Sequence, residues 1–98
     1  MKSLFLTACL LICVSFLQAV PFTLHNSTLQ SIPLIIPGVM NPNLSPMSNS
    51  GVDLQVGQKI FFKVRGRRYL LLEVTEDLRD VKLDVGSLLK ERKRELGI

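Results

Sequence analysis

Residues 52–75, which read VDLQVGQKIFFKVRGRRYLLLEVT, decide the fold. Apolar and polar residues alternate along most of this stretch, and a period of two is typical of β-strands with one buried face. The polar segments Gly57-Gln58 and Arg65–Arg68 predict turns, so the stretch divides into three antiparallel strands. The side chains expected to face inward are Val52, Leu54, Val56, Ile60, Phe62, Val64, Leu70, Leu72 and Val74.

The opposite face of this hairpin is also apolar in part. Phe61, Tyr69 and Leu71 fall on it by the same alternation. Either this face is covered by another part of the chain, or it is an exposed apolar patch of the kind that marks a partner surface.

The flanking segments extend the pattern. PFTLHN (21–26) alternates, and SIPLII (31–36) is an apolar run that Pro33 restricts to an edge strand, since proline has no N–H to donate. Downstream, 81–85 predicts a short strand. SLLKERKREL then predicts a helix over 85–96, with Asp84 as its N-cap and Gly97 as its C-cap.

Short strands followed by one terminal helix are typical of a small β-rich domain. We therefore expect a mainly β fold, a small β-sandwich or barrel-like domain with one short C-terminal helix. It forms a single domain over residues 20–98, because no internal repeat or linker divides the chain.

The first residues, MKSLFLTACLLICVSFLQA, have the layout of a secretory signal peptide over 1–19. The apolar run from Leu4 to Leu17 is shorter than the roughly 18–20 residues that span a bilayer. Cleavage after Ala19 predicts a secreted or periplasmic protein that does not span a membrane. A retained anchor and lipidation at Cys9 are the alternatives.

Chemistry-bearing residues are few. Both cysteines, Cys9 and Cys13, lie in the predicted signal peptide, so disulfides, thiol catalysis and thiolate metal sites are not expected in the domain. The single histidine, His25, has no acidic partner in sequence and no catalytic motif is present, so we expect neither an enzyme nor a cofactor. His25 with Met40 and Met47 leaves a copper-binding protein as a minor alternative.

A long uncharged stretch, PGVMNPNLSPMSNSG (37–51), predicts an ordered loop. Loops of more than about 12 to 15 residues in compact domains tend to be functional or disordered. Amide and hydroxyl side chains suit neutral polar ligands, although the same side chains also satisfy their own backbone in a structural crossover. The candidate binding residues of this loop are Asn41, Asn43, Ser45 and Asn49.

Basic residues suggest a second surface. Its candidate binding residues are Arg65, Arg67 and Arg68 in the predicted hairpin. With the cations of 90–94 in the helix they suit phosphate or anionic lipid, whereas export makes nucleic acid an unexpected partner. The RGRR pattern (65–68) also fits furin-type processing, and Asn26 and Asn43 begin glycosylation sequons if the source is eukaryotic.

These observations predict a small exported binding or structural module that is not an enzyme. Its expected partner is a protein or a component of the cell envelope. A secreted precursor processed at 65–68 is the main alternative.

Overall fold

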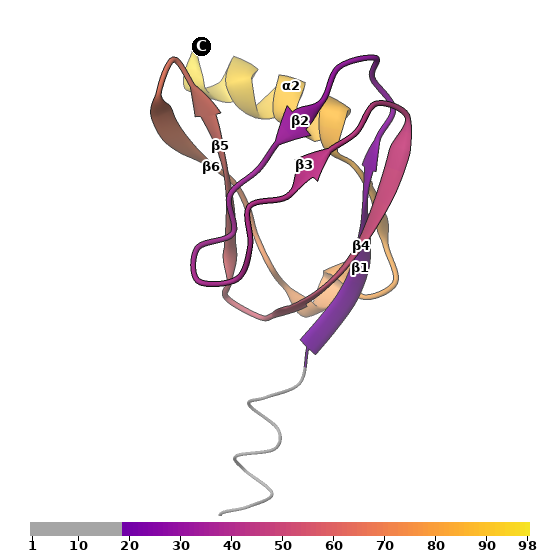
Figure 1. Ribbon diagram of the computed structural model, residues 1–98. Helices are drawn as coiled ribbons and strands as arrows, with labels where there is room; N and C mark the ends of the chain where they lie inside the picture. Colours follow the sequence, from indigo (N-terminus) through magenta and orange to yellow (C-terminus); the bar gives the residue numbers. More distant parts are fainter. Residues whose placement is uncertain (1–18) are drawn as a thin grey trace, which may run out of the picture.

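The computed structural model describes residues 19–98, and the predicted signal peptide lies outside the described residues except for Ala19. The chain is mainly β with one C-terminal helix, as the sequence predicts. Figure 1 shows its elements: β1 (Ala19–Asn26), β2 (Ile32–Pro33), β3 (Asn43–Leu44), β4 (Ser48–Gln55), β5 (Lys59–Val64), β6 (Arg67–Glu73), the 3-10 turn η1 (Glu76–Leu78), β7 (Lys82–Asp84) and α2 (Val85–Leu96).

The strands form three small sheets. β1 is the central strand of the first, antiparallel to β4 from Ala19↔Gln55 to Asn26↔Ser48 and parallel to β7. β2 pairs with β3, and β5 pairs with β6 in a hairpin. A bridge between Ile35 and Phe61 joins the β2 segment to β5, with N–H···O distances of 2.8 and 2.9 Å.

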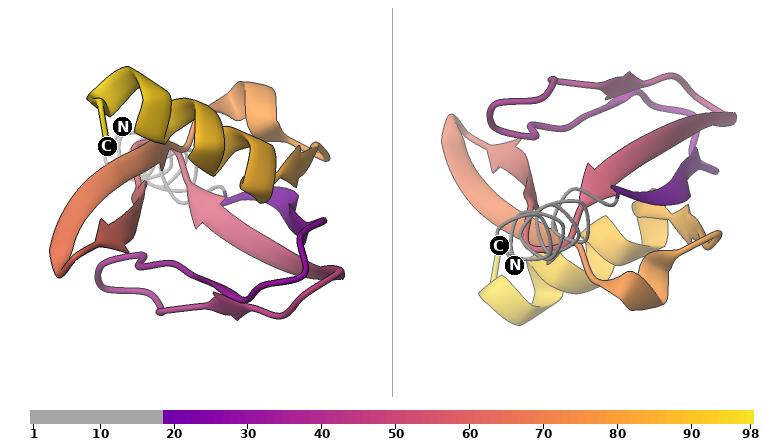
Figure 2. Two further views of the ribbon diagram at one scale, coloured as in Figure 1. Left: turned by 90° about the horizontal axis from the view of Figure 1, so that it is seen from above. Right: turned by 90° about the horizontal axis from the view of Figure 1, so that it is seen from below.

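The sheets and the helix enclose one core. Viewed along the long axis, α2, the β5–β6 hairpin, the β1–β4 pair and the β2–β3 segment surround it (Figure 2). Each side contributes apolar residues, and this burial is the main favourable term in folding. The buried apolar residues are Val20, Phe22, Leu24, Ile32, Leu34, Ile36, Leu44, Val52, Leu54, Ile60, Phe62, Leu71, Val74 and Val85.

Both predicted caps of α2 are confirmed. The Asp84 side chain accepts a hydrogen bond from the Ser87 backbone N–H, which is the usual N-cap contact. Gly97 has φ 72°, the left-handed conformation that suits glycine after a helix. Arg92 of α2 is half-buried and donates from Nε to the Leu70 carbonyl oxygen at 2.8 Å.

The predicted alternation of β6 is wrong at its centre. Leu71, expected to face outward, is buried, and Leu70 and Leu72 are only half-buried. The cause is a bulge: Ile60 pairs with Leu72 and Phe61 pairs with Leu70, so Leu71 is an extra residue that has no partner. A bulge reverses the faces on one strand, which the alternation of residues cannot predict.

Two other residues were expected on the outer face. Tyr69 instead packs against the core, and Phe61 is half-buried. The Arg68 guanidinium lies 5.7 Å from the centre of its ring. A cation over an aromatic face is attracted by the ring quadrupole. The outer face of this hairpin is therefore partly covered by its own side chains.

The prediction of one long loop over 37–51 is also wrong. Residues 37–40 make a tight turn that the Ile36–Met40 bridge closes, the chain returns as β3, and β4 begins at Ser48. Ser48–Gly51 pair with Asn26–Thr23 of β1. Strand pairing uses backbone groups, so this small polar segment extends a strand without alternating apolar residues. At its other end β4 stops at Gln55, and Val56, expected inside, is 58% exposed.

Asn26 is the one buried polar residue in the described part of the chain, and it connects three segments. Its Nδ2 donates to the carbonyl oxygens of Gln30 (2.7 Å), Leu44 (3.1 Å) and Ser45 (3.1 Å). Its Oδ1 accepts from the Thr28 N–H (2.9 Å) and Oγ–H (2.6 Å). The side chain therefore fixes segment 27–31 against β3, and burial withholds this sequon from a glycan in the folded domain.

Gly86 allows that segment to lie against the start of α2. A Cβ at this position would stand 2.8 Å from Thr28 Cγ2, closer than real contacts allow. We expect Gly86→Ala to lower the free energy of unfolding by about 1 kcal/mol, because overpacking costs about 1–3 kcal/mol and alanine recovers up to about 1 kcal/mol in a helix. Urea unfolding of both proteins measures this difference in the free energy of unfolding. Gly51→Ala, where no atom lies within 4 Å, is the matched control and should not destabilise.

Candidate functional site

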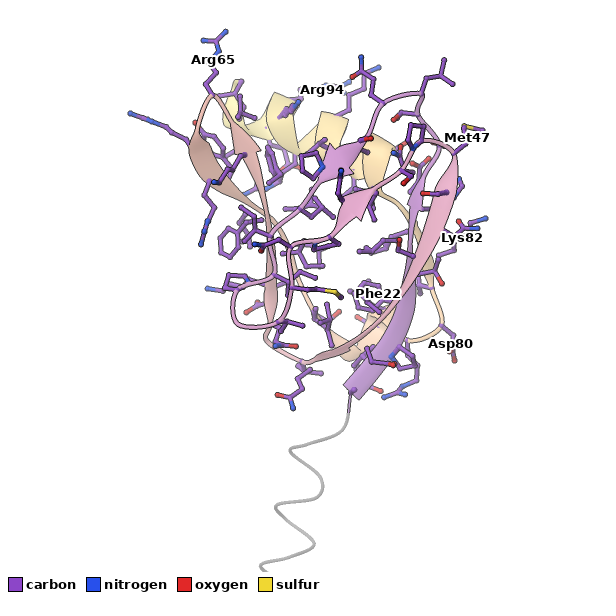
Figure 3. All side chains as sticks on the ribbon, in the orientation of Figure 1. Phe22, Met47, Arg65, Asp80, Lys82 and Arg94 are labelled. Atoms are coloured by element: carbon purple, nitrogen blue, oxygen red, sulfur yellow. The ribbon has the colours of Figure 1, made fainter. Side chains whose placement is uncertain are left out.

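Basic side chains gather at one end of the molecule, which we call the basic end. It is formed by the β5–β6 hairpin, whose Arg65-Gly66 turn has φ of 52° and 81° as in a type I′ turn, and by the last turns of α2. Figure 3 shows Arg65 and Arg94 at this end and Asp80 at the other. The cations of the basic end are Lys63, Arg65, Arg67, Arg68, Lys90, Lys93 and Arg94.

The largest groove of the basic end lies between residues 28–33, β5 and α2, and we call it the helix groove. Its volume is about 580 Å³. Ile32, Phe62 and Leu89 form apolar parts of its lining. Its basic lining residues are Lys63, Lys90 and Lys93.

A second groove, of about 390 Å³, lies on the other side of β2 and shares Lys63 with the helix groove. Asn41 and Arg68 both line it, beside Pro37 and Ile35. The fold thus brings together one predicted binding residue from the 37–51 stretch and one from the hairpin. The reason is the Ile35–Phe61 bridge, which holds the 37–40 turn next to β5.

Arg65 and Arg67 line a different groove, with Tyr69 and the C-terminal residues Gly97 and Ile98. Successive residues of a strand point to opposite faces, so Arg67 and Arg68 are directed to opposite sides of the hairpin. The three arginines therefore do not form one three-pronged site, although all belong to the basic end.

The seven cations of the basic end form no ion pair with a carboxylate side chain in the described residues. No Asp or Glu of residues 19–98 lines the four grooves that its cations line. The ion pairs in this part of the chain join Arg79 to Glu76 (2.6 Å) and Arg92 to Glu95 (2.9 Å), so neither includes a cation of the basic end. Clustered like charges destabilise a free surface and attract an anionic partner.

The opposite end is acidic. Asp53 and Asp80 line a groove beside the start of β1, and Asp80 donates its backbone N–H to the Pro21 carbonyl oxygen. Glu76 and Asp77 lie in η1 at the same end (Figure 1). The domain is therefore polarised along its length, with β1 entering at the acidic end.

The remaining predicted binding residues do not line these grooves. Asn43 is exposed in β3, and Ser45 accepts hydrogen bonds through its carbonyl oxygen from Asn26 and from Ser48 Oγ. Asn49 Oδ1 lies 2.5 Å from His25 Nδ1 across the β1–β4 pair. Their contacts within the domain are those of residues that hold β3 and β4 in place.

The residues of the two alternative predictions, a copper site and a processing site at 65–68, can also be located in the structure. Among residues 19–98 no group of three His, Cys, Asp or Glu side chains is placed to hold a metal ion, and Met47 is 64% exposed at a turn. The RGRR site spans the hairpin turn and the first residues of β6, and the Tyr69 ring lies 5.8 Å from that of Phe62. Cleavage after Arg68 would require the β5–β6 pairing to open.

Sequence reasoning missed residues 28–31 as part of a site. Leu29 is 85% exposed beside the helix groove. The available signal was a leucine in the polar run NSTLQS, between two predicted strands. The position of Leu29 next to α2 depends on the contacts of Asn26 and Gly86, and no local sequence pattern predicts these contacts.

Asp84 holds the segment that carries residues 28–31, which line the helix groove, and its contribution to stability depends on pH. Hydrogen bonds from the Ser87 backbone N–H and hydroxyl lower the pKa of the Asp84 carboxyl, and the Ser27 hydroxyl and His25 add to this. A lowered pKa means that the carboxylate stabilises the fold above its unfolded pKa of about 4, and that this stabilisation is lost as the pH falls through the folded value.

We therefore expect Asp84→Asn to be less sensitive to acid than the wild type. Urea midpoints of both proteins measured from pH 7 to pH 2 should converge at the acidic end. Asp53→Asn, on the exposed face of β4, is the matched control for the loss of one negative charge, and its urea midpoint at pH 7 should stay near that of the wild type. A constant difference between Asp84→Asn and the wild type at every pH would contradict this role.

The sequence matches no protein-family model, and no similar curated protein or solved structure was found. Within residues 19–98, none of the helices has both the length and the apolar character needed to cross a membrane. The site must therefore be interpreted from its own chemistry.

Proposed function

We propose that this chain is a small exported binding module, not an enzyme, whose basic end holds an anionic partner in the cell envelope or outside the cell. The observation that carries the proposal is the set of grooves lined by seven cations and by no Asp or Glu side chain of residues 19–98. Export rests on the signal-peptide pattern of residues 1–19.

The fold supports a rigid binding surface. The three sheets enclose one core, which favours a barrel-like domain over a two-layer sandwich. The hairpin is short and paired up to its Arg65-Gly66 turn, and Arg92 ties α2 to it through the Leu70 carbonyl oxygen. Cations on two connected elements keep their spacing, so little conformational freedom is lost when a partner binds.

Binding to heparin, used as a soluble polyanion probe, tests the proposal. The triple variant Arg65→Gln, Arg67→Gln, Arg68→Gln should bind at least tenfold more weakly, and wild-type affinity should fall as salt rises. The matched control is the triple variant Lys59→Gln, Arg79→Gln, Lys82→Gln. It removes the same number of positive charges from positions that do not line these grooves. Equal losses in both variants would show a net-charge effect and contradict the proposal.

The precursor alternative makes the opposite demand on the hairpin, since a processed peptide does not need β5 and β6 to remain joined. The intact mass of the protein from its native host separates the two. A single species from Val20 to Ile98 supports the module, and a chain that ends at Arg68 contradicts it.

A further inference from the structure

The helix groove has a chemical character that differs from the rest of the basic end. The arginines of the hairpin lie on exposed backbone, whereas the helix groove reaches the core. Ile32 and Phe62, which line it, are 6% and 2% exposed, and both belong to the main apolar cluster. Leu89 lines it from α2 and packs against the same cluster.

Ammonium groups surround this apolar lining from two separate elements. Lys63 is on β5, and Lys90 and Lys93 are on α2, at the other side of the groove. Lysine has a long flexible stem, so its ammonium group can follow a ligand while the stem covers apolar surface. The lining includes no carboxylate that would oppose an anion.

The exposed Leu29 belongs to the same groove. It is the most exposed large apolar residue of the described chain, at 85%, and it lines the groove. The segment that carries it is not free to move, because Asn26 and Asp84 hold residues 27–30 through hydrogen bonds. A fixed, exposed leucine beside the groove offers apolar surface that a ligand in the groove can cover.

We propose that the helix groove binds a single-chain anionic amphiphile, a molecule of the long-chain carboxylate class. The hydrocarbon tail packs on Leu29 and Leu89, over the base that the buried Ile32 and Phe62 form, and the carboxylate is held by Lys63, Lys90 and Lys93. The volume of about 580 Å³ is within the range of about 300–1,000 Å³ of pockets that hold small organic ligands. This inference rests on the proposed function, since it names the ligand of one groove of the basic end.

Dodecanoate is the probe that tests the proposal, with dodecanol as the uncharged tail and butanoate as the charge without a long tail. NMR titration of the intact domain gives the affinity and the site together. We expect saturable binding of dodecanoate, with shifts at residues 28–33, 62–63 and 86–93. Dodecanol and butanoate should each bind at least tenfold more weakly, because each lacks half of the interaction.

Three variants locate the binding. Lys63→Gln with Lys90→Gln should weaken dodecanoate at least tenfold, and Leu29→Ser should weaken it severalfold without altering the urea midpoint, because that side chain is exposed. The control, Lys59→Gln with Lys82→Gln, should bind as the wild type does. Absence of saturable binding, or equal losses in the two double variants, would overturn the proposal.

Vesicles containing phosphatidylglycerol separate a single bound molecule from docking on a bilayer. If the vesicles bind through Lys63 and Lys90 while monomeric dodecanoate does not, the surface is a membrane-docking face and the proposal is wrong. If heparin binding persists but dodecanoate fails, only this inference is overturned. If both fail, the proposed function is overturned with it.

Discussion

Replacing Asn26 with aspartate is expected to unfold the domain. The amide Nδ2 of Asn26 faces three carbonyl oxygens, and a carboxylate in its place would present a negative oxygen to all of them without a hydrogen to donate. Burying an unpaired charge costs about 3–5 kcal/mol. Because small domains have total stabilities near the lower end of about 5–15 kcal/mol, this loss leaves little or no folded protein.

Circular dichroism during urea titration measures this loss, and the matched control is Asn43→Asp. Asn43 begins the second sequon and is exposed in β3. The same amide-to-carboxylate change at this position should leave the urea midpoint near that of the wild type. If the two variants unfold at similar urea concentrations, the hydrogen bonds of Asn26 do not hold segment 27–31 in place.

Truncating Leu24 to alanine is the second change with a large expected effect. Leu24 is fully buried in β1, opposite Ser50 of β4 on one side and Leu83 of β7 on the other. Leucine-to-alanine changes in cores cost about 2–5 kcal/mol, since both the transfer free energy and the contacts around the new cavity are lost. We expect a loss near the middle of that range, because three elements pack at this position.

The comparison with Leu29→Ala makes the measurement specific to burial. The same side chain is removed, but from a position that is 85% exposed, so the free energy of unfolding should change by less than about 0.5 kcal/mol. Chemical unfolding of both variants gives the two values. A similar small loss at both positions would mean that β1 is not the centre of the core.

Sequence alone predicted the elements that have strong local signals. The termini of α2 followed from Asp84 and Gly97, whose side-chain and backbone properties act within one turn. The strands β1, β5 and β6 followed from alternation. The bulge that buries Leu71 and the pairing that extends β4 over Ser48–Gly51 could not follow, because both depend on the partner strand rather than on local composition.

The candidate site could be predicted only in part, because it too depends on contacts between distant segments. The basic residues were recognisable one by one, but their arrangement in grooves depends on tertiary contacts. Asn41 meets Arg68 only because a bridge joins Ile35 to Phe61, and Arg67 is separated from Arg68 by the two faces of a strand. The helix groove required residues 28–33, β5 and α2 together, which no single stretch of sequence contains.

The parallel pairing of β1 with β7 has a consequence for when the chain acquires its structure. β1 is the first of the described strands to be synthesised, whereas its parallel partner, Lys82–Asp84, is the last. Contacts between distant parts of a chain form slowly, because loop closure must precede them. The sheet of β1 is therefore complete only once residues 82–84 have been synthesised, and a shorter chain lacks one of its edges.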